Sequence, residues 1–92
     1  MCTSIVEVVD ADGAGKGEGG WFRLTHAAVS YDHPHHALFE EAITIDFVNR
    51  ALGPEARVAV ELALDSAKEL SAALARAIAA AEIEEAGRRR QA

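Results

Sequence analysis

The sequence predicts an α+β protein with two layers, a four-stranded, mainly antiparallel sheet and one long C-terminal helix. Three observations lead to this prediction. The first two thirds of the chain hold four segments rich in β-branched or alternating apolar residues, separated by glycine, proline and polar residues. The last third is rich in alanine and repeats apolar residues at three- and four-residue steps. A length of 92 residues suits one domain, residues 1–92.

The first two strands are predicted on either side of a glycine-rich segment. Cys2 to Val9 is rich in β-branched residues and is the first strand candidate. Residues 10–20 contain five of the seven glycines, so we expect a flexible loop there. Trp21 to Tyr31 carries apolar side chains on both parities. That pattern indicates a strand that is covered on both faces or carries a bulge.

The third and fourth strands alternate more cleanly. In Ile43 to Val48 and in Arg57 to Leu62, apolar residues alternate with polar ones, as in strands with one buried face. A Gly-Pro turn signal separates the two segments. We expect an antiparallel pair with Asp46 and Arg57 or Glu61 on the open face.

The C-terminal third is predicted to be helical from Ser66 to about Ala86, because alanine is the best helix former. Ser66-Ala67-Lys68-Glu69 matches the capping box, and Gly87 is placed to end the helix. The apolar residues of the segment form a stripe that can lie on the sheet. Residues 88–92 form a basic tail, and its arginines suit the carbonyl end of a helix.

Composition excludes several classes of function. The formal net charge of -6 argues against a general nucleic-acid binder, since phosphate affinity comes from clustered Lys and Arg. No apolar run approaches the roughly 20 residues that span a bilayer, and no apolar leader follows basic residues, so we expect no membrane association. The single cysteine, Cys2, makes no internal disulfide, and a reducing cytoplasm is the expected location.

The chain has one chemically distinctive segment, residues 32–41, which holds three of the four histidines and three of the fifteen acids. Pro34 pushes the residue before it into extended geometry and is favoured at the first position of a helix. We therefore expect the second strand to end at His33 and a short helix of about two turns to follow. On such a helix His36 and Glu40 stand one above the other at i and i+4, and His33 approaches the same end.

This arrangement predicts a site for a divalent transition metal, Zn or Fe. His33, His36 and Glu40 offer two imidazoles and a carboxylate, which are the ligands of many such sites. His26 is a further candidate ligand, and Cys2 is another. An open coordination position would hold a water suited to hydrolysis or hydration. The alternative interpretation is a solvated corner whose imidazoles and acids make ordinary hydrogen bonds.

Two other classes of function stay open. One is an interaction protein without chemistry, an accessory subunit that docks on a larger partner through its open sheet face or its alanine-rich helix. The other is a metal-free enzyme that uses Cys2 with a histidine, which requires a base or a helix N-terminus to depress the thiol pKa. Because the core relies on alanines and few aromatics, we also expect a homodimer.

A nucleotide cofactor is not expected. Gly15, Gly17 and Gly20 satisfy G-x-G-x-x-G in number. The dinucleotide fingerprint, however, must open a helix, whereas this one leads into the strand that begins at Trp21.

Several short motifs follow one another along the chain: Gly15-Lys16-Gly17, Gly20-Trp21-Phe22, Tyr31-Asp32-His33-Pro34, Ile45-Asp46-Phe47, Gly53-Pro54 and Ala56 to Leu62. In these motifs the chain resembles a family of small uncharacterised bacterial proteins that begin Met-Cys-Thr and are catalogued as a domain of unknown function. The resemblance covers nearly the whole chain and implies no activity, cofactor or catalytic residue. His33, Pro34 and His36 belong to the family pattern and His35 and His26 do not, which favours His33 and His36 as ligands.

Overall fold

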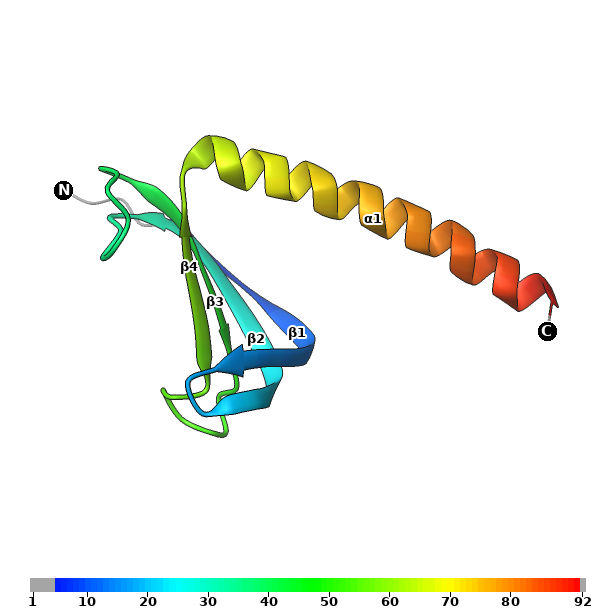
Figure 1. The fold of residues 1–92 in the computed structure, drawn as a ribbon, viewed down its shortest axis with the longest axis horizontal. Coiled ribbons are helices and arrows are strands. Elements are labelled where there is room, and N and C mark those ends of the chain that lie inside the picture. The colour runs from blue at the N-terminus through cyan, green and yellow to red at the C-terminus, as the bar shows by residue number, and fades with distance from the viewer. Residues whose placement is uncertain (1–4, 92) are drawn as a thin grey trace.

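The computed structural model describes residues 5–91, and Figure 1 shows their arrangement. Four strands form one antiparallel sheet in the order β1-β2-β3-β4, and one helix follows. This confirms the predicted α+β fold with a four-stranded antiparallel sheet and one long C-terminal helix. The elements are β1 Ile5–Gly17, β2 Gly20–Asp32, β3 Ala42–Val48, β4 Arg57–Leu62 and α1 Leu64–Gln91.

The glycine-rich segment is mostly strand, which corrects the flexible loop expected over residues 10–20. β1 continues to Gly17, which pairs with Gly20 across a two-residue turn. The register of β1 on β2 shifts between Asp10 and Gly13, and such an irregularity increases the local bend of a strand. The predicted first strand is therefore present from Ile5 onward, while its beginning at Cys2 lies outside the described residues.

Two glycines allow the sheet to curl so that the end of β1 approaches β4. A Cβ atom on Gly15 would lie 3.1 Å from Cδ2 of Leu24 and 3.2 Å from Cγ2 of Val58. A Cβ atom on Gly17 would lie 3.3 Å from the backbone oxygen of Arg57. Glycine in a strand often marks such a close approach, and here it explains Gly15 and Gly17.

The strand register sorts the side chains onto two faces, because residues paired across strands point the same way. We call one the apolar face, and Glu7 is the only charged residue in the three four-strand rows that define it. The other, the polar face, carries Ser30, Thr44, Asp46, Arg57 and Glu61. The apolar face consists of the rows Ile5-Tyr31-Ile43-Leu62, Glu7-Val29-Ile45-Val60 and Val9-Ala27-Phe47-Val58.

The expected pairing of the third and fourth strands is confirmed. β3 and β4 are antiparallel, with Asp46 and Arg57 on the polar face. Both Nε and Nη2 of Arg57 lie 2.8 Å from Oδ1 of Asp46. The connection between them closes around the side chain of Asn49, which is 7% exposed, donates to the Arg23 carbonyl at 2.8 Å and accepts from the Ala51 N–H at 2.9 Å.

Very little of the described chain is buried. Its buried hydrophobic residues are three alanines, Ala27, Ala42 and Ala56. The chain exposes 7326 Å², whereas a compact monomer of 9.8 kDa exposes about 5,200 Å². The radius of gyration is 16.0 Å, against about 12 Å for a compact domain of this length. The part of the chain that the structure describes is thus an open structure without a core of large side chains.

Helix α1 projects away from the sheet (Figure 1). Leu70, Leu74 and Ile78, which form its apolar stripe, are 50%, 59% and 51% exposed. The predicted second layer therefore does not form within one chain. Only Ala63 separates β4 from α1, and its carbonyl already accepts the N–H of Ala67 at 2.9 Å. No loop is left to turn the helix back onto its own sheet.

The predicted helix is present but longer than expected. It begins at Leu64, before the predicted capping box, and continues through Gly87 to Gln91. Gly87 does not adopt the positive φ by which glycine ends helices, so the three arginines lie in the last turn rather than in a tail. Among the described residues, no helix is both long enough and apolar enough to cross a membrane.

Candidate functional site: the β2–β3 corner

The corner between β2 and β3, residues 33–41, contains bends and no helix, which corrects the short helix expected after Pro34. The backbone N–H groups of His35, His36 and Ala37 all donate to the carboxylate of Glu61 on β4, at 2.6, 2.8 and 2.8 Å. A peptide of this length is a marginal helix on its own. These three contacts from a distant strand therefore decide its shape.

Glu61 is held as an anion. The pKa of its carboxyl is lowered from 4.5 to about 2, first by the backbone hydrogen bond from His35, then by that from Ala37, against desolvation. The His36 N–H and the charge of the His36 ring act in the same direction. Hydrogen bonds to an ionised acceptor are stronger than neutral ones, so this carboxylate anchors the corner to the sheet.

A second group of charges lies where β2 ends and β3 begins. Nδ1 of His33 is 3.1 Å from Oε1 of Glu41 and 3.0 Å from the backbone oxygen of Glu40. Asp32 accepts the backbone N–H of His33 at 2.7 Å. One ligand atom from each of Asp32, His33 and Glu41 lies within 4.8 Å of the other two. Among residues 5–90, this is the group that brings together three side chains able to hold a metal ion.

The charge environment of His33 follows from these contacts. Its pKa is raised above 6.5, first by the hydrogen bond to the Glu40 carbonyl and then by the charge of Glu41. The ring is exposed, whereas Asp32 and Glu41 are half-buried. The proton on Nδ1 therefore lies between the Glu40 carbonyl and the Glu41 carboxylate. These oxygen atoms would also attract a metal ion.

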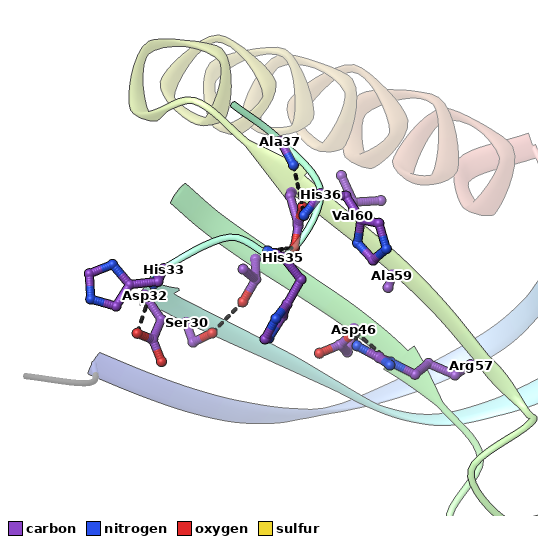
Figure 2. A pocket seen from close by; sticks show the side chains of 12 residues that line it. Ser30, Asp32, His33, His35, His36, Ala37, Asp46, Arg57, Ala59 and Val60 are labelled. Carbon is purple, nitrogen blue, oxygen red and sulfur yellow. Dashed lines mark hydrogen bonds and ion pairs between the residues drawn. The ribbon is translucent and has the colours of Figure 1, made fainter. Parts of the chain in front are cut away.

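The three histidines of the corner do not converge. Figure 2 shows the His33 ring beside Asp32, directed away from His35 and His36. The rings of His35 and His36 lie over the polar face, where an open hollow of about 810 Å³ is lined also by Asp46 and Arg57. Ser30 and Thr44 also line this hollow and share a hydrogen bond between their hydroxyl groups.

The structure separates the ligands expected from the sequence. His33 lies in the group with two carboxylates, but Glu40 contacts it through the backbone carbonyl. His36 and Glu40 belong to no group of three potential ligands within the described residues. His26 has Nε2 3.5 Å from Asp10 and Nδ1 2.8 Å from Oγ1 of Thr25. It lies six residues before Asp32 on β2, about 20 Å away along an extended strand.

Cys2, the remaining candidate, lies outside the described residues. Two potential ligands that the sequence reasoning missed are Asp32 and Glu41. A signal for them was present, because β2 and β3 pair as antiparallel neighbours with Asp32 opposite Ala42. The residues just beyond this last pair, His33 and Glu41, must then face each other across the corner.

The fold and the corner define a small α+β protein with an open sheet, a projecting helix and one histidine between two carboxylates. The chain belongs to a family of unknown function (DUF6295), which matches residues 1–87. This confirms the resemblance to a domain of unknown function found in the sequence. Comparison with curated proteins and with solved structures gives no match.

Proposed function

We propose that the chain binds a divalent transition metal at the β2–β3 corner, through Asp32, His33 and Glu41. The observation that supports this is the mutual spacing of their ligand atoms, within 4.8 Å. Nitrogen and oxygen ligands lie about 2.0–2.2 Å from zinc, so ligands of one ion lie at most about 4.4 Å apart. Small side-chain adjustments are enough to bring the three onto one ion.

The ligand types narrow the choice of metal. An imidazole suits Zn and Fe, and two carboxylates add a preference for a hard divalent ion. The proposed set keeps His33 from the sequence prediction and replaces His36, Glu40 and His26 by the two carboxylates that the structure places beside it. Three protein ligands leave coordination positions for water, and metal-bound water at such sites serves hydrolysis or hydration.

Elemental analysis after incubation with Zn²⁺ or, without oxygen, Fe²⁺ tests this proposal. We expect the wild-type protein to retain metal near one ion per chain after gel filtration. His33→Ala should lose at least about tenfold in affinity, since even indirect changes around a metal cost 10–100-fold. His35→Ala and His36→Ala are matched controls in the same loop and should keep the metal. Wild-type protein that retains none, or a His33→Ala variant that retains as much, would contradict the site.

We also propose that the working form is a homodimer. The exposed area exceeds that of a compact monomer by about 2,100 Å², which lies within the roughly 1,000–2,500 Å² that each chain buries in obligate homodimers. A folded dimer gains stability with concentration. The midpoint of thermal unfolding should therefore rise with protein concentration, and a constant midpoint would contradict the dimer.

The second candidate is an accessory subunit that uses the same exposed apolar surface to dock on a larger protein. Isolation from the native source with another protein at a fixed ratio would favour it over the homodimer. The proposed location for either form is the cytoplasm, which the single cysteine supports. A metal-free enzyme built on Cys2 stays a prediction, and an alkylation rate typical of an ordinary thiol would contradict it.

A further inference from the structure

We infer that in the homodimer each α1 lies across the apolar face of the partner's sheet, so that the two chains exchange their helices. The inference rests on the proposed homodimer and specifies which surface of each chain contacts the other chain. It starts from two apolar surfaces on one chain that do not cover each other.

The connection between the sheet and the helix is too short to form a loop. Helices that return over a sheet are joined to it by loops of about two to six residues. Here β4 ends at Leu62 and α1 begins at Leu64. Ala63 between them already accepts the first helical hydrogen bond, from Ala67 at 2.9 Å. The helix is therefore directed away from its own sheet (Figure 1), and short hinges of this kind favour exchange of an element between two chains.

The surface of α1 carries an exposed apolar stripe. Leu70, Leu74 and Ile78 recur at four-residue steps and lie on one side of α1, each about half exposed. Ala77 and Ala81 extend the same stripe, and no charged residue interrupts it between Leu70 and Ala81. An apolar stripe of this kind normally faces a core, which the described residues of one chain do not provide.

The apolar face of the sheet matches this stripe in character and in width. The apolar face exposes Ile5 at 58%, Val9 at 53%, Val29 at 36% and Val60 at 37%. Four strands span about 14 Å from the first to the last. The eleven steps from Leu70 to Ala81, the end of the stripe, rise about 16 Å along the helix axis. The stripe is thus long enough to cross all four strands of a partner.

Two-fold symmetry makes the exchange complete. In an isologous dimer every contact occurs twice, so each chain gives one helix and receives one. Both apolar surfaces of both chains are then covered, and the hinge at Ala63 needs no loop. A dimer joined only through its two helices would leave the apolar face of each sheet exposed to water. The large area that one chain exposes therefore favours an arrangement that also covers the sheets.

Cross-linking of paired cysteine variants tests the inference. Leu70→Cys, Leu74→Cys and Ile78→Cys are each made in a Cys2→Ser chain, and each is mixed by refolding with a second Cys2→Ser chain that carries one strand cysteine. Val9 and Val8 are matched positions for the strand cysteine. They are neighbours on β1 with exposures of 53% and 49%, but Val9 is on the apolar face and Val8 on the polar face.

A short bifunctional maleimide should join the two different chains when Val9→Cys is paired with at least one helix variant, and Val8→Cys should give at most a tenth of that yield. Joining between two copies of one helix variant, with none to Val9→Cys, would overturn the exchange and leave the homodimer standing. Equal yields with Val8→Cys and Val9→Cys would overturn it as well. A protein that is monomeric before cross-linking would overturn the homodimer itself.

Discussion

The two faces of the sheet differ in how many of the contacts that they need are made within one chain. On the polar face, Glu61 accepts three backbone N–H groups, and Asp46 pairs with Arg57. On the apolar face, side chains such as Ile5 and Val9 are more than half exposed. The polar contacts are therefore made within the chain, whereas the apolar face requires a second surface to cover it.

This difference indicates which properties depend on one chain and which on two. Hydrogen bonds and ion pairs are local and directional, so they are complete once β2, β3 and β4 pair. Burial depends on total area, and residues 5–90, whose buried hydrophobic side chains are three alanines, provide too little of it. We therefore expect changes on the polar face to alter one loop or one site, and changes to the apolar surfaces to alter the whole fold.

The largest effect is expected on the apolar side, from Leu74→Glu. An unpaired charge in a covered interface costs several kcal/mol, so the dimer should weaken by at least about 100-fold in Kd. Ala72→Glu is the control, because it lies about 200° away around α1. Sedimentation equilibrium over a range of concentrations measures both. Equal Kd values for the two variants would remove the role given to the helix stripe.

The next effect compares two neighbouring acids of the corner. Glu41→Gln should lower the affinity for Zn²⁺ by at least about tenfold, because removing a ligand should cost no less than altering its surroundings. Glu40→Gln should change it little, since Glu40 contacts His33 through its backbone carbonyl. Isothermal titration of both variants distinguishes the proposed ligand set from the one expected from the sequence. A loss of Zn²⁺ affinity confined to Glu40→Gln would instead support the ligand set expected from the sequence.

A smaller effect is expected at the curl of the sheet. Gly17→Ala places a Cβ atom 3.3 Å from the Arg57 backbone oxygen, which cannot move without the strand. We expect the free energy of unfolding to fall by about 1–3 kcal/mol, as overpacking does. Gly19→Ala meets nothing within 4 Å and should be nearly neutral. Urea unfolding compares them, and an equally stable Gly17→Ala protein would argue against the close approach of β1 and β4.

The most local effect is expected at Glu61. Glu61→Gln keeps the shape of the side chain but removes the charge that the three N–H groups of His35, His36 and Ala37 share. Hydrogen exchange at these three amides should become faster, with little change in the helix. Unchanged protection would show that the loop is held by other contacts.

The same residue gives a pH dependence. The pKa of Glu61 is lowered from 4.5 to about 2 in the folded chain, so the unfolded chain binds its proton first as pH falls. Its contribution to stability is present above pH 4.5 and is lost as pH falls towards 2. Acid titration of unfolding should therefore be shallower for Glu61→Gln over that range. Identical slopes would contradict the role of this carboxylate.

The sequence predicted the elements whose signal is local. The alternation in Ile43 to Val48 and Arg57 to Leu62 gave the pair β3–β4, and alanine content gave α1. The strand through Gly13 to Gly17 was missed because its glycines have no strand propensity, and only the approach of β4 explains Gly15 and Gly17. Long-range contacts decided this element.

The sequence predicted where the candidate site lies but not which residues form it. The cluster was found from its composition, but its ligands were chosen on a helix that does not form. The carboxylate of Glu61, at least 24 residues away in the sequence, accepts the backbone N–H groups of residues 35–37, where such a helix would begin. The ion pair of His33 with Glu41 follows from the register of β2 and β3, which treating the two strands as neighbours would have supplied.

The mass of the protein in solution tests most directly whether the apolar surfaces need a second chain. Light scattering during gel filtration at micromolar concentration should give twice the chain mass of 9.8 kDa, with the circular dichroism of a folded α+β protein. A well-folded species of 9.8 kDa that shows a cooperative thermal transition would contradict the account.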